Sequence, residues 1–368
     1  MKDNANTAQM RWQQYYQLFA TITVLLGFYG VTNCHGQALV NVEPSAFSEG
    51  HHDQQGLFCL DSANCTPGVI GMPRPKGIFM EYEFDPSYRV IPKNNEGLAS
   101  GTFEARAHST FSAGLRLPVV RSHHTKLIVG FKFRDENYNV SEADAAAEPF
   151  YQQLNTENLY SLGTSVYLTH YNHNSTYWLV RGKVSLDGDY RGDGKPFGEY
   201  LNFSFTPIFG WKKHHDLSYG LGVSVKHAYG RFSVYPVLLY FRNFNEEWGL
   251  EAAIPSKVRL RYRPNVRTNI YVGARLEGTR NALVIDSPLS DGGVLALERA
   301  DLRYGIRLER ELHDWLWIGV AGGLRQPISL RVADNFTAGF PRVFDADSRA
   351  SLYGSAGIFI VPPRKWLD

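Results

Sequence analysis

The chain has 368 residues, and 38 Lys and Arg against 36 Asp and Glu give a formal net charge of only +2. This balance argues against a nucleic-acid-binding protein, and a mean hydropathy of −0.29 excludes a bundle of membrane helices. The 21 Tyr, 22 Phe and 34 Gly contrast with only 3 Cys and 4 Met. Such a composition is typical of an all-β protein, either a soluble sandwich or a membrane barrel.

The N-terminus carries one long apolar stretch, residues 18–31. This stretch is shorter than the roughly 20 residues that a membrane-spanning helix needs. Positively charged residues precede it, and the small residues of Gly36-Gln37-Ala38 follow it. The pattern predicts that residues 1–38 are a signal peptide and that the protein is exported. The alternative is a membrane anchor that stays attached.

The mature chain keeps two cysteines, Cys59 and Cys65. In an oxidising compartment we expect them to form a short disulfide loop. A metal site with His51 and His52 is the alternative, but their spacing fits no common zinc pattern. All four residues lie in residues 39–76, where Gly, Pro, Ser and Asn are scattered without a period. We predict an irregular periplasmic extension here, and neither a metal nor a cofactor.

Beyond residue 76, apolar residues recur at every second position. In residues 78–84, for example, the apolar side chains at even positions alternate with Glu81 and Glu83. Successive side chains of a strand point to opposite faces, so alternation marks a strand with one apolar face. Strands are predicted at 77–85, 101–117, 125–134, 157–171, 175–187, 199–212, 216–227, 230–243, 247–254, 257–263, 268–279, 297–310, 314–333 and 349–361. Most exceed the roughly 5–6 residues usual in soluble proteins and suit the about 9–11 residues of a membrane-spanning strand.

The connections between these strands alternate in length. Short polar turns such as 172–174 and 213–215 follow every second strand, whereas most other connections are long, as at 135–156 and 280–296. Short turns at one end and long loops at the other are the layout of an outer-membrane barrel. We therefore predict an all-β fold, a transmembrane antiparallel up-and-down β-barrel of 12 to 14 strands. The smaller number applies if the short strands around Pro255 do not belong to the wall.

The predicted barrel covers residues 77–361 and leaves residues 362–368 as a C-terminal tail. An exported soluble β-sandwich is the structural alternative. One helix is expected in the loop from Ser141 to Leu154, because Ser141 is a good N-cap and three alanines follow. Pro149 is expected to kink this helix or to end it early.

Charged residues gather on the face that would line the barrel interior, and the basic ones are in excess. A water-filled lumen of this kind would favour anions. The alternative is that arginines and carboxylates pair across the lumen and brace a closed barrel. The triple Arg259, Arg261 and Arg263 is the part least easily neutralised by its own strand. The lumen-facing candidates are Arg106, Arg116, Arg259, Arg261, Arg263, Arg275, Arg303 and Arg307.

No pattern of catalytic residues stands out. Histidine pairs at 123–124 and 214–215 lie in predicted short turns, where solvated polar residues are expected. His108 and Ser109 are adjacent on a strand, so their side chains point to opposite faces and are poorly placed for a catalytic pair. We therefore expect no enzyme activity.

The chain resembles a family of outer-membrane β-barrel proteins classed only as a domain of unknown function. The resemblance covers about residues 76–361 and implies an outer-membrane barrel without an agreed activity. The motifs that carry it are Ser112-Ala113-Gly114-Leu115-Arg116-Leu117-Pro118, the loop 141–154 leading into Leu159-Tyr160-Ser161-Leu162-Gly163, Ile254-Pro255-Ser256-Lys257, Leu260-Arg261-Tyr262-Arg263-Pro264-Asn265 and Ile270-Tyr271-Val272-Gly273.

Three functions follow as hypotheses. The first is a passive or gated outer-membrane pore for small solutes, in contact with outer-membrane lipid. The second is a closed structural or surface-interaction barrel that acts through its long extracellular loops. The third is a lipid-modifying enzyme, for which the sequence nominates no catalytic residue. No nucleic-acid partner is expected, and protein partners cannot be named.

Overall fold

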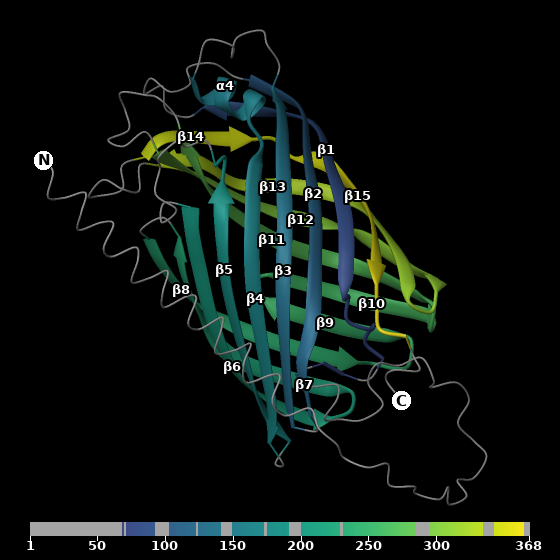
Figure 1. Ribbon diagram of the computed structural model, residues 1–368. Helices are drawn as coiled ribbons and strands as arrows, with labels where there is room; N and C mark the ends of the chain where they lie inside the picture. The colour runs from purple at the N-terminus through teal and green to yellow at the C-terminus, as the bar shows by residue number, and fades with distance from the viewer. Residues whose placement is uncertain are drawn as a thin grey trace, which may run out of the picture. The chain divides into compact units, whose positions relative to one another are not determined.

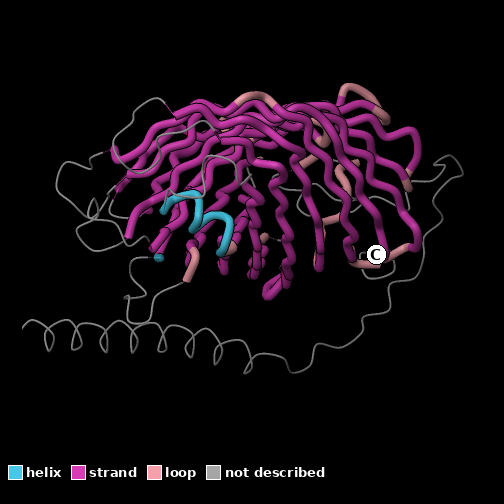
Figure 2. Tube along the Cα trace, turned by 90° about the horizontal axis from the view of Figure 1, so that it is seen from above, coloured by secondary structure: helices cyan, strands magenta, loops and turns pink. Residues whose placement is uncertain are grey.

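A computed structural model shows an antiparallel β-barrel in which strands make up nearly all of the chain that is described (Figures 1 and 2). The structure describes residues 68–69, 71–92, 103–122, 124–140, 149–172, 175–190, 200–228, 231–284, 294–333 and 342–363. The predicted signal peptide, and the predicted pair Cys59 and Cys65, lie outside these residues.

The strands follow one another along the chain with one short helix between β3 and β4. Their bounds are β1 Ile78–Pro92, β2 Phe103–Arg121, β3 Thr125–Val140, α4 Pro149–Thr156, β4 Leu159–Asn172, β5 Thr176–Gly188, β6 Leu201–His214, β7 Leu217–Ala228, β8 Arg231–Asn243, β9 Trp248–Ile254, β10 Lys257–Asn265, β11 Thr268–Val284, β12 Val294–His313, β13 Leu316–Ala333, β14 Arg342–Ser348 and β15 Ser351–Ile360.

Each strand from β2 to β13 pairs with its neighbours in sequence, and β1 closes the ring against the C-terminal strands. Residues 78–84 of β1 pair with β15, and Val90–Pro92 of β1 pair with β14. Both β14 and β15 also pair with β13, so together they fill a single position in the wall. The 14-strand closed barrel is therefore confirmed, with β9 and β10 in the wall.

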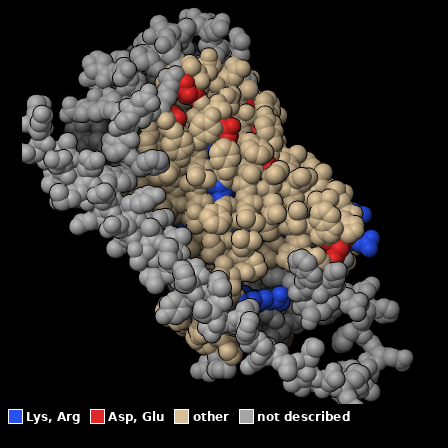
Figure 3. Space-filling model, viewed as in Figure 1, with Lys and Arg blue, Asp and Glu red and all other residues tan. Residues whose placement is uncertain are grey.

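The outer face of the barrel is apolar. Along β1, Ile78, Met80 and Phe84 are each more than 40% exposed, and on β8 Phe232 and Val234 reach 69% and 67%. Figure 3 shows one such face, on which few charged side chains appear. A continuous exposed apolar surface of this size would aggregate in water but suits the hydrocarbon core of a bilayer. The outer face is thus the lipid-facing band of a membrane-spanning barrel.

Among the described helices, none is long and apolar enough to cross a membrane.

Two predicted details are wrong. Residues 334–348 were expected to form a loop, but Arg342–Ser348 is strand β14, which continues the wall above β15. Pro149 was expected to end or kink a helix, but α4 begins at this residue. Proline suits the first helical turn, because the N–H that it lacks would have no partner inside the helix there.

The barrel is pinched at the end where the long loops lie. Gly188 of β5 pairs in parallel with Ala282 of β11, although these strands lie far apart around the ring. A side chain at Gly188 would place its Cβ 2.6 Å from the carbonyl oxygen of Ala282, so glycine is needed for this approach. Tyr200, Ala228 and Val294 pack with Ala282 in the same buried cluster. Opposite walls therefore touch across the interior.

Candidate functional site

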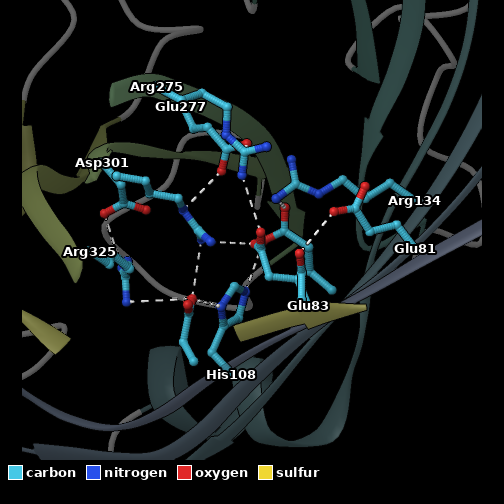
Figure 4. Close-up of polar contacts among 12 residues, drawn as sticks. Glu81, Glu83, His108, Arg134, Arg275, Glu277, Asp301 and Arg325 are labelled. Atoms are coloured by element: carbon cyan, nitrogen blue, oxygen red, sulfur yellow. Dashed lines mark hydrogen bonds and ion pairs between the residues drawn. The ribbon is translucent and has the colours of Figure 1, made fainter. Parts of the chain in front are cut away.

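The interior is crossed by a network of ion pairs centred on Arg303 of β12 (Figure 4). Its side chain is fully buried, and its guanidinium lies 2.5 Å from Oε1 of Glu83 and 3.2 Å from Oδ2 of Asp85, both on β1. It also lies 3.1 Å from Oε2 of Glu277 on β11, while Arg275 holds Glu83 at 3.2 Å and Glu277 at 3.0 Å. Because β1 and β12 are separated by two positions of the wall, these contacts run through the lumen.

The network continues toward the loop end through His108 of β2. Its Nδ1 lies 2.8 Å from Oδ2 of Asp85, and its Nε2 lies 3.4 Å from Oε2 of Glu136 on β3. Arg299 of β12 approaches the same carboxylate of Glu136 at 3.3 Å. All four side chains are buried, so each charge is stabilised mainly by its partners.

A further branch ties β13 into the network. Arg325, also fully buried, lies 3.1 Å from Oδ1 of Asp301 and 3.9 Å from Oδ2 of Asp85. Arg299 holds the other oxygen of Asp301 at 3.0 Å. Arginines and carboxylates from β1, β3, β11, β12 and β13 are thus interlocked.

The arginine triple of β10 is largely neutralised by neighbouring elements. Glu251 of β9 accepts hydrogen bonds from both Arg259 and Arg261, at 2.8 and 3.3 Å. Arg263 donates to the backbone oxygens of Gly71 and of residue 246. The partners of Arg259 and Arg261 thus include Glu251 of β9, and those of Arg263 come from residue 246 and the N-terminal segment.

Arg307 of β12 completes the pairing at the short-turn end. It contacts Glu81 at 2.7 Å and Glu309 at 2.9 Å, and Nζ of Lys76 lies 2.7 Å from Glu309. Lys76 precedes β1, and burial lowers the pKa of its ammonium group while the Glu309 carboxylate opposes this effect.

Residues just before β1 pack against the inside of the wall. Val69 is buried with Ile208 and Phe241, and Met72 packs against the same cluster. Arg74 forms two ion pairs, with Glu311 at 3.5 Å and with Asp314 at 3.1 Å. The described residues 68–69 and 71–76 of the predicted extension have no helix or strand, and they pack at the short-turn end of the interior.

Among the predicted lumen residues whose side chains are described, Arg116 takes no part in the network. Arg116 lies with its guanidinium carbon 5.4 Å from the ring centre of Phe79, and it forms no ion pair with any residue the structure describes. Arg106 lies on β2, but its side chain is outside the described residues. The other six candidates, Arg259, Arg261, Arg263, Arg275, Arg303 and Arg307, have the partners given above.

A second set of interior cations has no acidic partner. Within the described ranges, these side chains form no ion pair and no hydrogen bond, although each lies on the inward-facing row of its strand. They occupy β2, β3, β5, β7 and β10, largely away from the centre of the network. They are Arg116, Lys132, Arg181, Lys183, Lys226 and Lys257.

Small cavities are lined by residues of both sets. One of about 120 Å³ is lined by Lys132, Lys183 and Lys226 together with carboxylates, and another of about 100 Å³ is lined by Lys257 together with paired arginines. A water molecule takes about 30 Å³ in the liquid, so each cavity has room for a few waters. The interior thus combines paired charges with cations that face small cavities.

Sequence reasoning missed Asp85, Glu136 and Arg325 as interior charges. The signal for Asp85 was present, because it follows Glu81 and Glu83 at the same spacing within the predicted strand 77–85. Glu136 lies beyond the predicted end of its strand at 134, whereas β3 reaches Val140. The outward row of β3 becomes polar after residue 133, which hides the alternation there.

In the part of the chain that is described, no cluster of three or more His, Cys, Asp or Glu side chains has the arrangement of a metal site.

Comparison with known proteins gives a family and a set of distant structural resemblances. The toluene transporter TodX of Pseudomonas putida is 7% identical, with 78% of this chain and 90% of that chain covered and a TM-score of 0.35. A Pseudomonas aeruginosa FadL homologue is 9% identical, with 77% and 90% covered and a TM-score of 0.35. The KdgM porin is also 9% identical, with 77% and 99% covered and a TM-score of 0.28.

No protein with a curated description matches the chain. Residues 199–360, from the start of β6 to the end of β15, match a family described as a domain of unknown function, DUF6268. The expected resemblance to an uncharacterised barrel family is therefore confirmed, and the matched residues form the C-terminal part of the barrel.

Proposed function

We propose that the protein is an outer-membrane channel for small solutes, with a narrow, gated lumen whose unpaired cations favour anions. The observation that carries this proposal is the division of the interior charges. The carboxylates of β1, β9, β11 and β12 are held by arginines, whereas Lys132, Lys183, Lys226 and Lys257 face small cavities without an acidic partner. Ammonium groups used only to brace the wall would be expected to have partners.

The same structure gives a reason for gating. The contact between Gly188 and Ala282 brings opposite walls together at the loop end, and residues 68–76 occupy the short-turn end. Passage of a solute would require one or both of these contacts to open. The outer membrane is the compartment that fits an exported barrel with an apolar outer face.

A closed, braced barrel is the second candidate, and the cross-lumen network around Arg303 favours it. Such a barrel would act through its long loops. The contact between Gly188 and Ala282 would then stay closed permanently. It shares the fold and the membrane location with the channel, so only transport distinguishes the two.

The experiment is single-channel recording in a planar bilayer, with protein purified in detergent from the outer-membrane fraction. Discrete conductance steps with a reversal potential on the anion-selective side of a KCl gradient would support the channel. A folded, heat-modifiable barrel that gives no steps, in the wild type and in a Gly188→Val variant, would favour the closed barrel. Absence of the protein from the membrane fraction would contradict both.

A further inference from the structure

An interior cavity of about 120 Å³ brings together lysine side chains from three strands. Lys132 comes from β3, Lys183 from β5 and Lys226 from β7, and Asn281 of β11 also lines the cavity. The charge of Lys183 acts on each of the other two ammonium groups.

The nearby carboxylates are already committed to other partners. Glu136 is held by Arg134 at 2.6 Å and by Arg299 at 3.3 Å. Asp187 accepts hydrogen bonds from Ser161, Ser185 and Asn202. Neither carboxylate lies within ion-pair distance of the three lysines. Both carboxylates line the same cavity, but neither forms an ion pair with a lysine, so the three ammonium groups have no ion-pair partner among the described residues.

An independent feature of the same cavity points to a ligand. Asn281 is only 5% exposed, and its Nδ2 has no hydrogen-bond partner. Leaving a buried amide donor without a partner is unfavourable, because the group has lost its hydrogen bonds to water. An acceptor placed in the cavity would satisfy this donor and the lysine ammonium groups together.

We propose that this cavity is a binding site for a small oxyanion of the phosphate type, held by Lys132, Lys183, Lys226 and Asn281. A tetrahedral oxyanion offers several acceptor oxygens, which suits donors that converge from different walls. Lysine binds such groups as a point charge, without the fixed planar geometry that arginine imposes. The site deepens the proposed function, on which it rests, because it would select the solute within the lumen.

The test is isothermal titration of inorganic phosphate into the full-length barrel, purified in detergent at low salt. We expect saturable binding that weakens at least tenfold in the double variant Lys183→Gln/Lys226→Gln. The matched control is Lys213→Gln, which removes the same charge from the exposed end of β6, outside the cavity, and should leave the phosphate affinity within about twofold. Heat-modifiability on a gel shows that each variant is folded.

Titration with glycerol 3-phosphate distinguishes a free phosphate ion from a phosphate group on a small molecule. Titration with chloride at equal ionic strength tests whether the heat comes only from general screening of the lysine charges. No saturable heat with either phosphate compound, or an equal affinity in the double variant, would overturn the site. Phosphate binding by a barrel that never conducts would keep the site and refute the channel. Conductance without phosphate binding would do the reverse.

Discussion

Arg303 offers the sharpest test of the interior network. Replacing it with Met removes the one cation that contacts Glu83, Asp85 and Glu277 together. Breaking a buried ion pair by removing one partner costs about 3–5 kcal/mol, because the other charge stays buried. Here Asp85 keeps His108 at 2.8 Å, and the two glutamates keep Arg275. We therefore expect a loss near the lower limit, about 3 kcal/mol in the free energy of unfolding.

The assay is urea unfolding of the barrel in lipid vesicles, followed by tryptophan fluorescence. Lys257→Met is the matched control, since it also removes an interior cation but breaks no ion pair among the described residues. Adding Glu83→Gln to Arg303→Met should restore part of the lost stability. If Arg303→Met unfolds within about 0.5 kcal/mol of the wild type, as ordinary surface variants do, the network does not brace the barrel.

Three further changes test other parts of the interior. Glu251→Gln frees Arg259 and Arg261 from their shared carboxylate, so the reversal potential in a KCl gradient should shift toward stronger anion selectivity. An unchanged reversal potential would place these arginines outside the permeation path. Gly188→Val should separate β5 from β11 and increase the open probability in bilayer recordings, and an unaltered gating pattern would show that this contact is no gate. Arg74→Ala removes pairs to two acidic residues and should lower stability by about 2 kcal/mol in urea unfolding; equal midpoints would mean that the N-terminal segment is not anchored there.

The wall of the barrel could be predicted from the sequence because its determinants are local. Alternation at residues 78–84 and the short turns define strands one hairpin at a time, and each strand pairs with its neighbour in sequence. The exception is β14, at Arg342–Ser348, where charged residues alternate with few apolar ones and a bend separates it from β15. Its place in the wall follows only from pairing with β13 and β1.

The pairing inside the barrel could not be predicted, because it depends on register between distant strands. Alternation assigns Arg259 and Arg303 to the inward row, but it does not say which carboxylate each one meets. Lys183 and Lys226 look no different in sequence from the paired arginines. Their lack of a partner becomes visible only when the whole ring has closed.

The partners of β1 have a consequence for the order of assembly. Glu83 and Asp85 emerge near the beginning of the barrel, but Arg303 follows Asp85 by 218 residues. Until β11 and β12 are in place, these carboxylates lack Arg275 and Arg303, so a partly formed sheet should stay open and hydrated along this edge. When the ring closes, β1 forms backbone hydrogen bonds with β15, and the carboxylates of β1 meet their arginine partners in the same step. The C-terminal strands therefore pair with β1 and neutralise its carboxylates together, so we expect ring closure to be cooperative.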